Sequence, residues 1–271
     1  MTTNTVAVHG ASGTQGSALA NRLRAAGYQI RPLTSRSIDL TDIESLVHAY
    51  RHADAVVVQL PLVFDPVALS YAETVLAALE KASVRRAMLN TGGPLPSEPV
   101  GVPYVDARWL LADRLPEAVE SAWIFGPGGP YLENLLQPWS MRRVRERGEL
   151  VYPLPGTLAL PWVTLDDIGD AMAAALSGVW ETRVNLLSGP QPIAGNMIAE
   201  AVAAAADRQV RWVQATPDEY QPLLATVIGA DAAANVIAHA AALTVAPAEM
   251  VRPGPTTIKQ WALRHDWAGR G

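Results

Sequence analysis

Near the start of the chain stands the stretch Val6–Gly16, which reads VAVHGASGTQG. Its apolar beginning, Val6–Val8, predicts a short buried strand, and the apolar spacing after the stretch predicts a helix over 17–26. Between them, glycines occupy every third position: Gly10, Gly13 and Gly16. Glycines let the backbone approach a ligand closely, and a helix start offers unpaired N–H groups. The stretch therefore predicts a site for a diphosphate.

The glycine spacing is G-x-x-G-x-x-G, which differs from the G-x-G-x-x-G of many dehydrogenases. A glycine triplet alone is also compatible with an ordinary strand-to-helix turn. The predicted strand before it and the predicted helix after it favour nucleotide binding instead. We therefore expect the turn to contact a dinucleotide through six residues: Gly10, Ser12, Gly13, Thr14, Gln15 and Gly16.

A second strand is predicted over 28–34, and its end bears on the choice of cofactor. Enzymes that prefer NAD usually place an Asp or Glu there, on the ribose 2′-hydroxyl. This chain has Ser35 and Arg36 instead, and a hydroxyl beside a guanidinium suits a 2′-phosphate. We therefore expect NADP(H), held in part by Ser35 and Arg36. The alternative is that Arg36 is a solvated loop residue.

Strands and helices then alternate along the first half of the chain. Apolar runs predict strands over 55–60, 86–90 and 121–125, separated by helices at 43–50, 66–82 and 104–115, the last ending before Pro116. Alternation of this kind, with right-handed crossovers, predicts an α/β fold with a doubly wound parallel sheet. Such sheets bind ligands at the carboxyl ends of their strands, so we expect cofactor contacts from Gln59, Leu60, Asn90 and Thr91.

The second half of the chain is predicted to be mostly helical. Helices are expected over 132–145, with a bend or interruption at Pro138, and over 166–176, 195–206, 217–227, 231–242 and 257–265. Strands are expected over 183–187 and 210–213, and 149–161 is expected to form a hairpin or an extended segment. The proline-rich stretch 94–103 is either a rim over a substrate or a stiff connector.

Composition excludes several kinds of protein. The 271 residues are 49% hydrophobic and 17% charged, which argues against disorder, and there is no cysteine for disulfide or thiol chemistry. No apolar run reaches the roughly 18 residues of a membrane span. The first residues lack a signal-peptide pattern, so we expect a cytoplasmic protein with no membrane partner. The five histidines show no metal-ligand spacing, so no metal is expected.

The densest basic cluster consists of Arg142, Arg143, Arg145 and Arg147 in a chain whose net charge is −5. The cluster is compatible with the solvated face of a helix or with a phosphate or nucleic-acid contact. Because the chain has no long basic run, we favour the solvated face and expect no nucleic-acid partner.

Four segments together resemble a known family: residues 8–16, residues 87–92, residues 125–135 with the pair Glu133-Asn134, and residues 160–169 with a strand followed by Asp167-Ile168. They resemble the NmrA-like branch of the atypical short-chain dehydrogenases. The resemblance implies a Rossmann fold, bound NADP(H) and a smaller C-terminal substrate lobe. We expect the Rossmann domain over 1–125, completed by about 156–190, and the lobe over 126–155 and 191–271.

Short-chain dehydrogenases commonly use a Ser or Thr together with a Tyr-x-x-x-Lys pair, in which the lysine charge helps the tyrosine to pass a proton to the substrate. The nearest equivalents here are Thr91, Tyr104 and Arg108, which we take as the candidate catalytic residues. Arginine keeps its proton in proteins, so Arg108 can supply charge or hold a cofactor ribose hydroxyl but cannot act as a base. The alternatives are that Tyr104 packs at a loop end and that the Thr91 hydroxyl bonds the backbone.

The resemblance implies an NADP(H)-dependent reductase that transfers hydride to a carbonyl, enone, quinone or polycyclic phenolic substrate. Substrate-binding residues are expected at Tyr131, Asn134 and Trp162. Two other functions are open: an NADP(H)-binding sensor or regulator without turnover, and a non-redox isomerase or cyclase on the same fold. The expected partner is a small-molecule substrate, and a homodimer is one assembly open to the chain.

Overall fold

The computed structural model describes residues 4–179, 183–240 and 251–269. The chain divides into two compact units. The first unit comprises residues 1–126 and 168–186, and the second comprises residues 127–167 and 187–271. The segment that returns to the first unit is thus shorter than the expected 156–190, because the residues before Ile168 belong to the second unit.

A parallel sheet forms the centre of the first unit. Its strands are β1 (Thr5–His9), β2 (Gln29–Leu33), β3 (Ala55–Val58), β4 (Arg86–Asn90) and β5 (Ser121–Pro127). Strand β1 pairs in parallel with both β2 and β3, and the ladder continues in parallel from β3 to β4 and β5.

Two later strands complete the sheet. They are β8 (Val184–Ser188) and β11 (Val251–Pro253), and the full order is β11-β8-β5-β4-β3-β1-β2. The order reverses between β1 and β3, which is the switch point at which doubly wound sheets bind nucleotides. The predicted α/β fold with a doubly wound parallel sheet is therefore confirmed.

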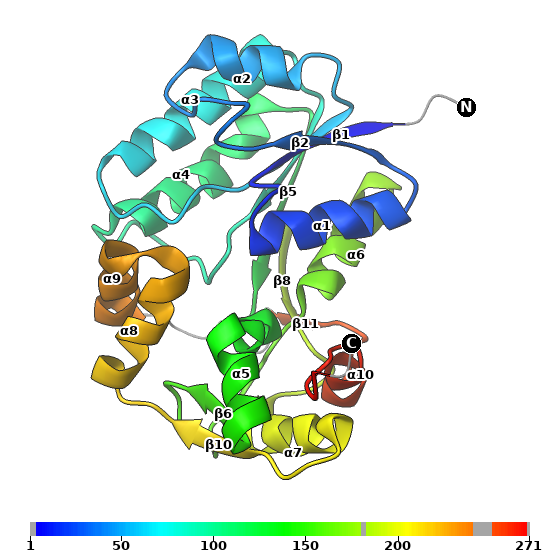
Figure 1. Ribbon diagram of the computed structural model, residues 1–271. Helices are drawn as coiled ribbons and strands as arrows, with labels where there is room; N and C mark the ends of the chain where they lie inside the picture. The colour runs from blue at the N-terminus through cyan, green and yellow to red at the C-terminus, as the bar shows by residue number, and fades with distance from the viewer. Residues whose placement is uncertain (1–3, 180–182, 241–250, 270–271) are drawn as a thin grey trace. The chain divides into compact units, whose positions relative to one another are not determined.

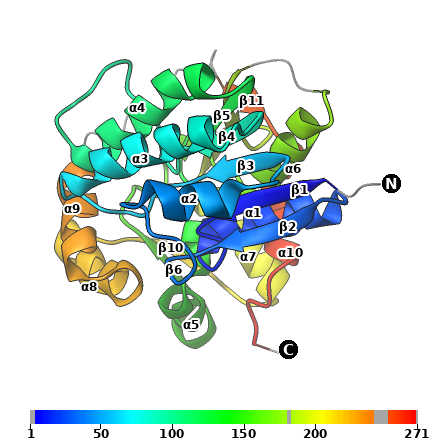
Figure 2. The same cartoon turned by 90° about the horizontal axis from the view of Figure 1, so that it is seen from above.

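Helices cover both faces of this sheet in the first unit (Figures 1 and 2). One face carries α1 (Thr14–Ala25) and α6 (Leu165–Leu176), which are joined by two hydrogen bonds of 2.7 Å from Arg22 to the Asp170 carboxylate. The other face carries α2 (Ile43–Tyr50), α3 (Val67–Lys81) and α4 (Pro103–Ala118). Strands covered on both faces are continuous apolar runs in the sequence, and the whole of β3 is buried.

Helix α4 differs from its prediction, because it continues through Pro116 to Ala118. A proline removes one hydrogen bond from the helix ladder and normally ends the helix before it. Here Leu111 and Leu115 are completely buried, and their packing holds the last turn. At the other end, the Asp106 carboxylate accepts hydrogen bonds from Val100 N (2.8 Å) and Gly101 N (2.9 Å), which fixes the entry to α4.

The second unit contains two small sheets. Strand β6 (Glu149–Tyr152) pairs in parallel with β10 (Arg211–Gln214), and β7 (Ala159–Leu160) pairs antiparallel with β9 (Ile193–Ala194). The hairpin interpretation of 149–161 is therefore wrong, and the segment is extended. The strands at its two ends find different partners because Pro153 and Pro155 interrupt the chain between them.

Helices pack around these sheets, and Figure 1 shows α5 (Pro138–Arg147) and α7 (Gly195–Ala206) beside β6 and β10. The helix predicted over 132–145 is split by Pro138 into the 3-10 turn η1 (Leu132–Leu136) and α5. The remaining helices are α8 (Pro217–Ile228), α9 (Ala230–Ala240) and α10 (Ile258–Leu263). Residues 241–242 of the predicted helix 231–242 lie outside the described residues. The core here is rich in tryptophan, with Trp162, Trp261 and Trp267 buried.

Candidate cofactor and catalytic site

The predicted glycine turn connects β1 to α1 in a conformation that only glycine adopts easily. Gly10 has a φ of +62°, and its carbonyl accepts a hydrogen bond of 2.8 Å from Gly13 N. A Cβ atom on Gly16 would collide with the backbone of Gly10 and would lie 2.8 Å from His9 O. Because Gly13 has no side chain, α1 begins without a side-chain cap. The close-packed turn and the uncapped helix start fit the diphosphate of a dinucleotide.

Three amide side chains connect the turn to the ends of β3 and β4. Asn90 Nδ2 donates to Gln15 Oε1 at 2.8 Å and to Gln59 Oε1 at 2.9 Å, and Asn90 is almost completely buried. The residues come from the start of α1, the end of β3 and the end of β4. The first unit thus brings three of the predicted cofactor residues into one network at the carboxyl edge of its sheet.

Tyr104 reaches the same edge from α4. A Cβ atom placed on Gly92, whose φ is +64°, would lie 3.3 Å from the Tyr104 hydroxyl and 3.4 Å from Gln15 Oε1. The hydroxyl and the amide therefore both lie close to Gly92, where any other residue would place its side chain. The Tyr104 ring also packs against Phe64, with ring centroids 5.5 Å apart. Gly92 was not predicted as a site residue, although two glycines directly after a strand were a signal for it.

Arg108 lies one turn further along α4 and is 3% exposed. Its guanidinium carbon is 4.1 Å from the centroid of the Tyr104 ring. Nη1 donates to Thr91 O, and Nε donates to Tyr104 O at 3.2 Å. Within the described part of the chain, no carboxylate lies within ion-pair distance of Arg108. Tyr104 and Arg108 are thus in contact, and the positive charge of Arg108 lies against carbonyl oxygens.

Thr91 is placed differently from a catalytic hydroxyl. Its Oγ1 donates to Gly93 O at 2.7 Å, its N donates to Phe125 O at 2.8 Å, and the residue is completely buried. The arrangement matches the alternative interpretation, in which the Thr91 hydroxyl forms a hydrogen bond with the backbone. Thr91 therefore shapes the Gly92–Gly93 turn that faces Tyr104 and Arg108.

The loop after β2 presents Ser35 and Arg36 to solvent. The turn is held by Ser37 N, which donates to Thr34 O at 2.9 Å, and by Arg36 N, which donates to Thr34 Oγ1 at 3.3 Å. In the described residues the Arg36 guanidinium has no hydrogen bond or ion pair, so it is available to an anion. Two further predicted residues, Ser12 and Thr14, are exposed at the glycine turn, whereas Leu60 is buried after β3.

A buried pair beside the turn was not predicted. His9 Nε2 lies 2.8 Å from the Tyr50 hydroxyl, and both side chains are 1% exposed. Burial lowers the pKa of His9 from 6.5 to about 4, so the ring is neutral near pH 7. The pair connects the end of β1 to α2 directly before Gly10. The only sequence signal was a histidine next to the glycine turn.

The predicted substrate residues Tyr131, Asn134 and Trp162 lie in the second unit. Tyr131 and Trp162 are buried, at 5% and 2% exposure. Asn134 Nδ2 donates to the Tyr152 hydroxyl at 3.3 Å, and the Trp162 ring packs against Tyr152 with centroids 5.2 Å apart. Asn134 and Trp162 thus share one neighbour, and Trp162 belongs to the core of the unit.

The neighbouring Glu133 was named only as part of a motif. Its Oε2 is buried without a hydrogen-bond partner. Burial raises the pKa of this carboxyl from 4.5 to about 7, and the nearby Asp166 and Asp167 carboxylates also raise it.

Of the described residues, no group of three or more His, Asp or Glu side chains is arranged to hold a metal, and no helix is long and apolar enough to cross a membrane.

Comparisons with known proteins bear on the family and the fold of the chain. The model of the NmrA-like family matches residues 2–245. A protein of Xenophilus azovorans named NAD(P)H azoreductase is 31% identical over 233 residues, which cover 79% of this chain and 78% of the relative.

Two solved structures share the fold. The triphenylmethane reductase of Citrobacter sp., complexed with NADP(H), has a TM-score of 0.69 and 15% identity, with coverage of 96% of this chain and 99% of that one. An NADPH-dependent quinone oxidoreductase of Escherichia coli has a TM-score of 0.65 and 17% identity, with coverage of 95% and 98%.

Proposed function

Because the chain belongs to the NmrA-like family, we propose that it is an NADPH-dependent reductase of planar conjugated acceptors, with quinones and azo compounds as the first candidates. The azoreductase relative supports a nicotinamide-dependent reductase. The observation that carries the proposal is the convergence, inside the first unit, of the glycine turn, the Asn90 amide network and the Tyr104 hydroxyl at one edge of the sheet.

The first unit has a group suited to each part of the dinucleotide. The glycine turn and the start of α1 suit the diphosphate, because they offer N–H groups and no obstructing side chain. Gln59 and Asn90 lie at the strand ends where the nicotinamide half is expected, and Gln15 at the start of α1 is hydrogen-bonded to Asn90. Arg36 and Ser35 suit the 2′-phosphate, which supports a preference for NADPH over NADH.

NADPH, when bound, supplies the hydride. The chain contributes orientation, exclusion of water and one proton. We assign that proton to the Tyr104 hydroxyl, which transfers it to the acceptor atom that gains negative charge and recovers it from water. The Arg108 guanidinium over the ring stabilises the phenolate that remains. One hydride and one proton thus add across the acceptor.

The test is a turnover assay on purified protein, in which NADPH absorbance is followed with a quinone, an azo dye and an enone. We expect NADPH consumption with at least one acceptor and slower consumption of NADH. Tight NADPH binding without consumption of any acceptor would instead indicate a sensor or regulator. Product formation without cofactor oxidation would indicate an isomerase or cyclase, and absence of binding would overturn the cofactor site.

A further inference from the structure

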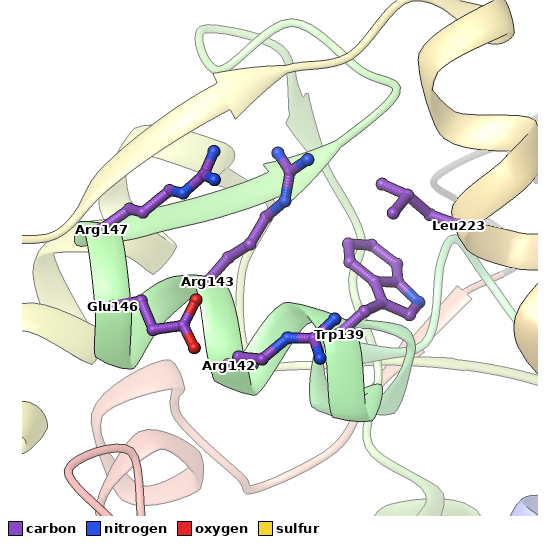
Figure 3. A pocket seen from close by; sticks show the side chains of 6 residues that line it. All are labelled: Trp139, Arg142, Arg143, Glu146, Arg147 and Leu223. Atoms are coloured by element: carbon purple, nitrogen blue, oxygen red, sulfur yellow. The ribbon is translucent and has the colours of Figure 1, made fainter.

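A pocket lies entirely within the second unit and contains none of the predicted site residues. Its volume is about 340 Å³, and it is formed by α5 and one side chain of α8 (Figure 3). The lining residues are Trp139, Arg142, Arg143, Glu146, Arg147 and Leu223. Three of them belong to the arginine cluster that the sequence analysis interpreted as a solvated helix face.

The five lining residues of α5 share one helix face because they are spaced three or four positions apart. In Figure 3 the guanidinium groups of Arg143 and Arg147 extend from α5 in the same direction, and Trp139 lies beside Leu223. The pocket therefore has an apolar part and a charged part, in which three guanidinium groups outnumber the one carboxylate of Glu146 and leave a net positive charge. Arg145, which is not on this face, donates from Nη2 to Asp266 O at 2.8 Å.

The positive charge of the charged part is only partly balanced. Arg143 Nη1 lies 4.0 Å from Glu149 Oε2, and Glu149 is also paired with Arg211 at 2.5 Å. Over the described ranges of the chain, Arg142 and Arg147 have no hydrogen bond or ion pair. Like charges four positions apart on a helix, such as Arg143 and Arg147, destabilise it slightly. A bound anion would offset that repulsion.

The apolar part of the pocket is held in place by the core of the unit. The Trp139 ring is 5% exposed and makes an edge contact with Tyr220, with centroids 5.6 Å apart and an angle of 81°. Leu223 contributes the facing aliphatic surface from α8. A rigid indole with an aliphatic neighbour favours a flat ring over a flexible chain.

We propose that this pocket binds an aromatic anion, with its ring against Trp139 and Leu223 and its carboxylate or sulfonate on the guanidinium groups of Arg143 and Arg147. Guanidinium groups bind such oxyanions through paired, charge-assisted hydrogen bonds. All the lining residues belong to the second unit, so the site stands independently of the cofactor site and of the proposed reductase activity.

The test is calorimetric titration of the full chain with naphthalene-2-sulfonate. Arg143→Gln and Arg147→Gln are each expected to weaken binding roughly tenfold, because each removes one charge-assisted contact. Arg145→Gln is the matched control, since it removes the same charge from the same helix but outside the pocket. Thermal melting of each variant checks that it is folded. An equal loss in Arg145→Gln would mean that net charge alone attracts the probe, and would overturn the site.

Two further probes separate the ring from the anion. We expect 2-naphthol, which keeps the ring but has no charge near pH 7, and inorganic sulfate, which keeps the anion but has no ring, both to bind at least about tenfold more weakly. Sulfate binding as tight as that of the sulfonate would refute the role of Trp139 and Leu223. Failure of naphthalene-2-sulfonate to bind the wild-type chain would refute the proposal whatever the outcome of the reductase assay.

Discussion

The guanidinium carbon of Arg108 lies 4.1 Å from the centroid of the Tyr104 ring, one helical turn away on α4. The carbonyl oxygens of Thr91 and Tyr104 accept hydrogen bonds from the same guanidinium, so the cation is held over the ring. A lysine could not make these contacts in the same way, because its ammonium is a compact charge without a planar fork. The arginine thus keeps the charge of the usual pair with a more rigid geometry.

Tyr104→Phe is expected to lower kcat roughly 10²-fold, because it removes the proposed proton donor while leaving the ring contacts with Arg108 and Phe64. The dissociation constant for NADPH should stay unchanged. A turnover assay measures kcat, and a fluorescence titration measures the dissociation constant. Tyr28→Phe is the control, because Tyr28 is half-buried and directly precedes β2, at the amino edge of the sheet and opposite the site. Wild-type turnover in Tyr104→Phe would remove the hydroxyl from the mechanism.

Substitution of Arg108 separates charge from packing. Arg108→Met leaves the Thr91 and Tyr104 carbonyl oxygens without their donor and should destabilise the fold by about 1–3 kcal/mol in urea unfolding. Arg108→Lys restores a charge, so it should recover part of the kcat lost in Arg108→Met. If the two variants have the same kcat at the same stability, the charge over the Tyr104 ring plays no part in turnover.

Arg36→Gln tests the choice of cofactor. The guanidinium is exposed and has no partner in the described residues, so its loss should leave the fold intact. We expect the affinity for NADPH to fall roughly 10- to 100-fold while that for NADH is unchanged. Arg24→Gln at the end of α1 is the matched control, and nicotinamide fluorescence reports both constants. Parallel losses for the two cofactors would contradict a 2′-phosphate contact.

Two glycines of the turn should respond differently to alanine. A Cβ on Gly16 meets the backbone of His9 and Gly10, whereas a Cβ on Gly13 lies 3.4 Å from Gly10 O. Gly16→Ala should therefore lower the free energy of unfolding by about 1–3 kcal/mol and abolish cofactor binding. Gly13→Ala should keep nearly all of the stability. Comparable melting temperatures for the two variants would show that α1 does not need this close approach.

The pH dependence of stability should report Glu133. Its pKa is about 7 in the folded chain against 4.5 ordinarily, so the folded state binds more protons between these values and loses stability as the pH rises through them. Glu133→Gln removes that loss. The variant should gain up to roughly 3 kcal/mol relative to wild type between about pH 5 and pH 8 in urea unfolding. Glu200→Gln, at an exposed position of α7, should show no such trend.

Much of the fold was predictable because its signals are local. The helix expected over 43–50 is observed as Ile43–Tyr50, since the Asp42 side chain caps it through Glu44 N at 2.9 Å. The apolar runs of β1 and β3 and the glycines between β1 and α1 are equally local. The errors came from tertiary effects: α4 passes through Pro116 because Leu111 and Leu115 are buried, and β6 and β7 find separate partners.

The site residues also divide into those that local sequence signals predict and those that only the tertiary structure brings together. Single residues next to strand ends or glycines could be predicted, because the fold class places those positions at the ligand edge. The amide network could not, because Asn90 is 75 positions from Gln15 and 31 from Gln59, and only the sheet order brings them together. Trp162 was expected to bind substrate, and the structure places its side chain in the core of the second unit.

The division of the chain has a consequence for synthesis on the ribosome. Every residue that we propose to contact the cofactor, from Gly10 to Arg108, precedes residue 127, where the second unit begins. The residues proposed for the dinucleotide site have therefore all been translated before translation of the second unit begins. At roughly 5–20 residues per second, the strand that completes the first unit emerges several seconds later. A dinucleotide that bound the nascent chain during that interval would stabilise the first unit before its last strand had been added.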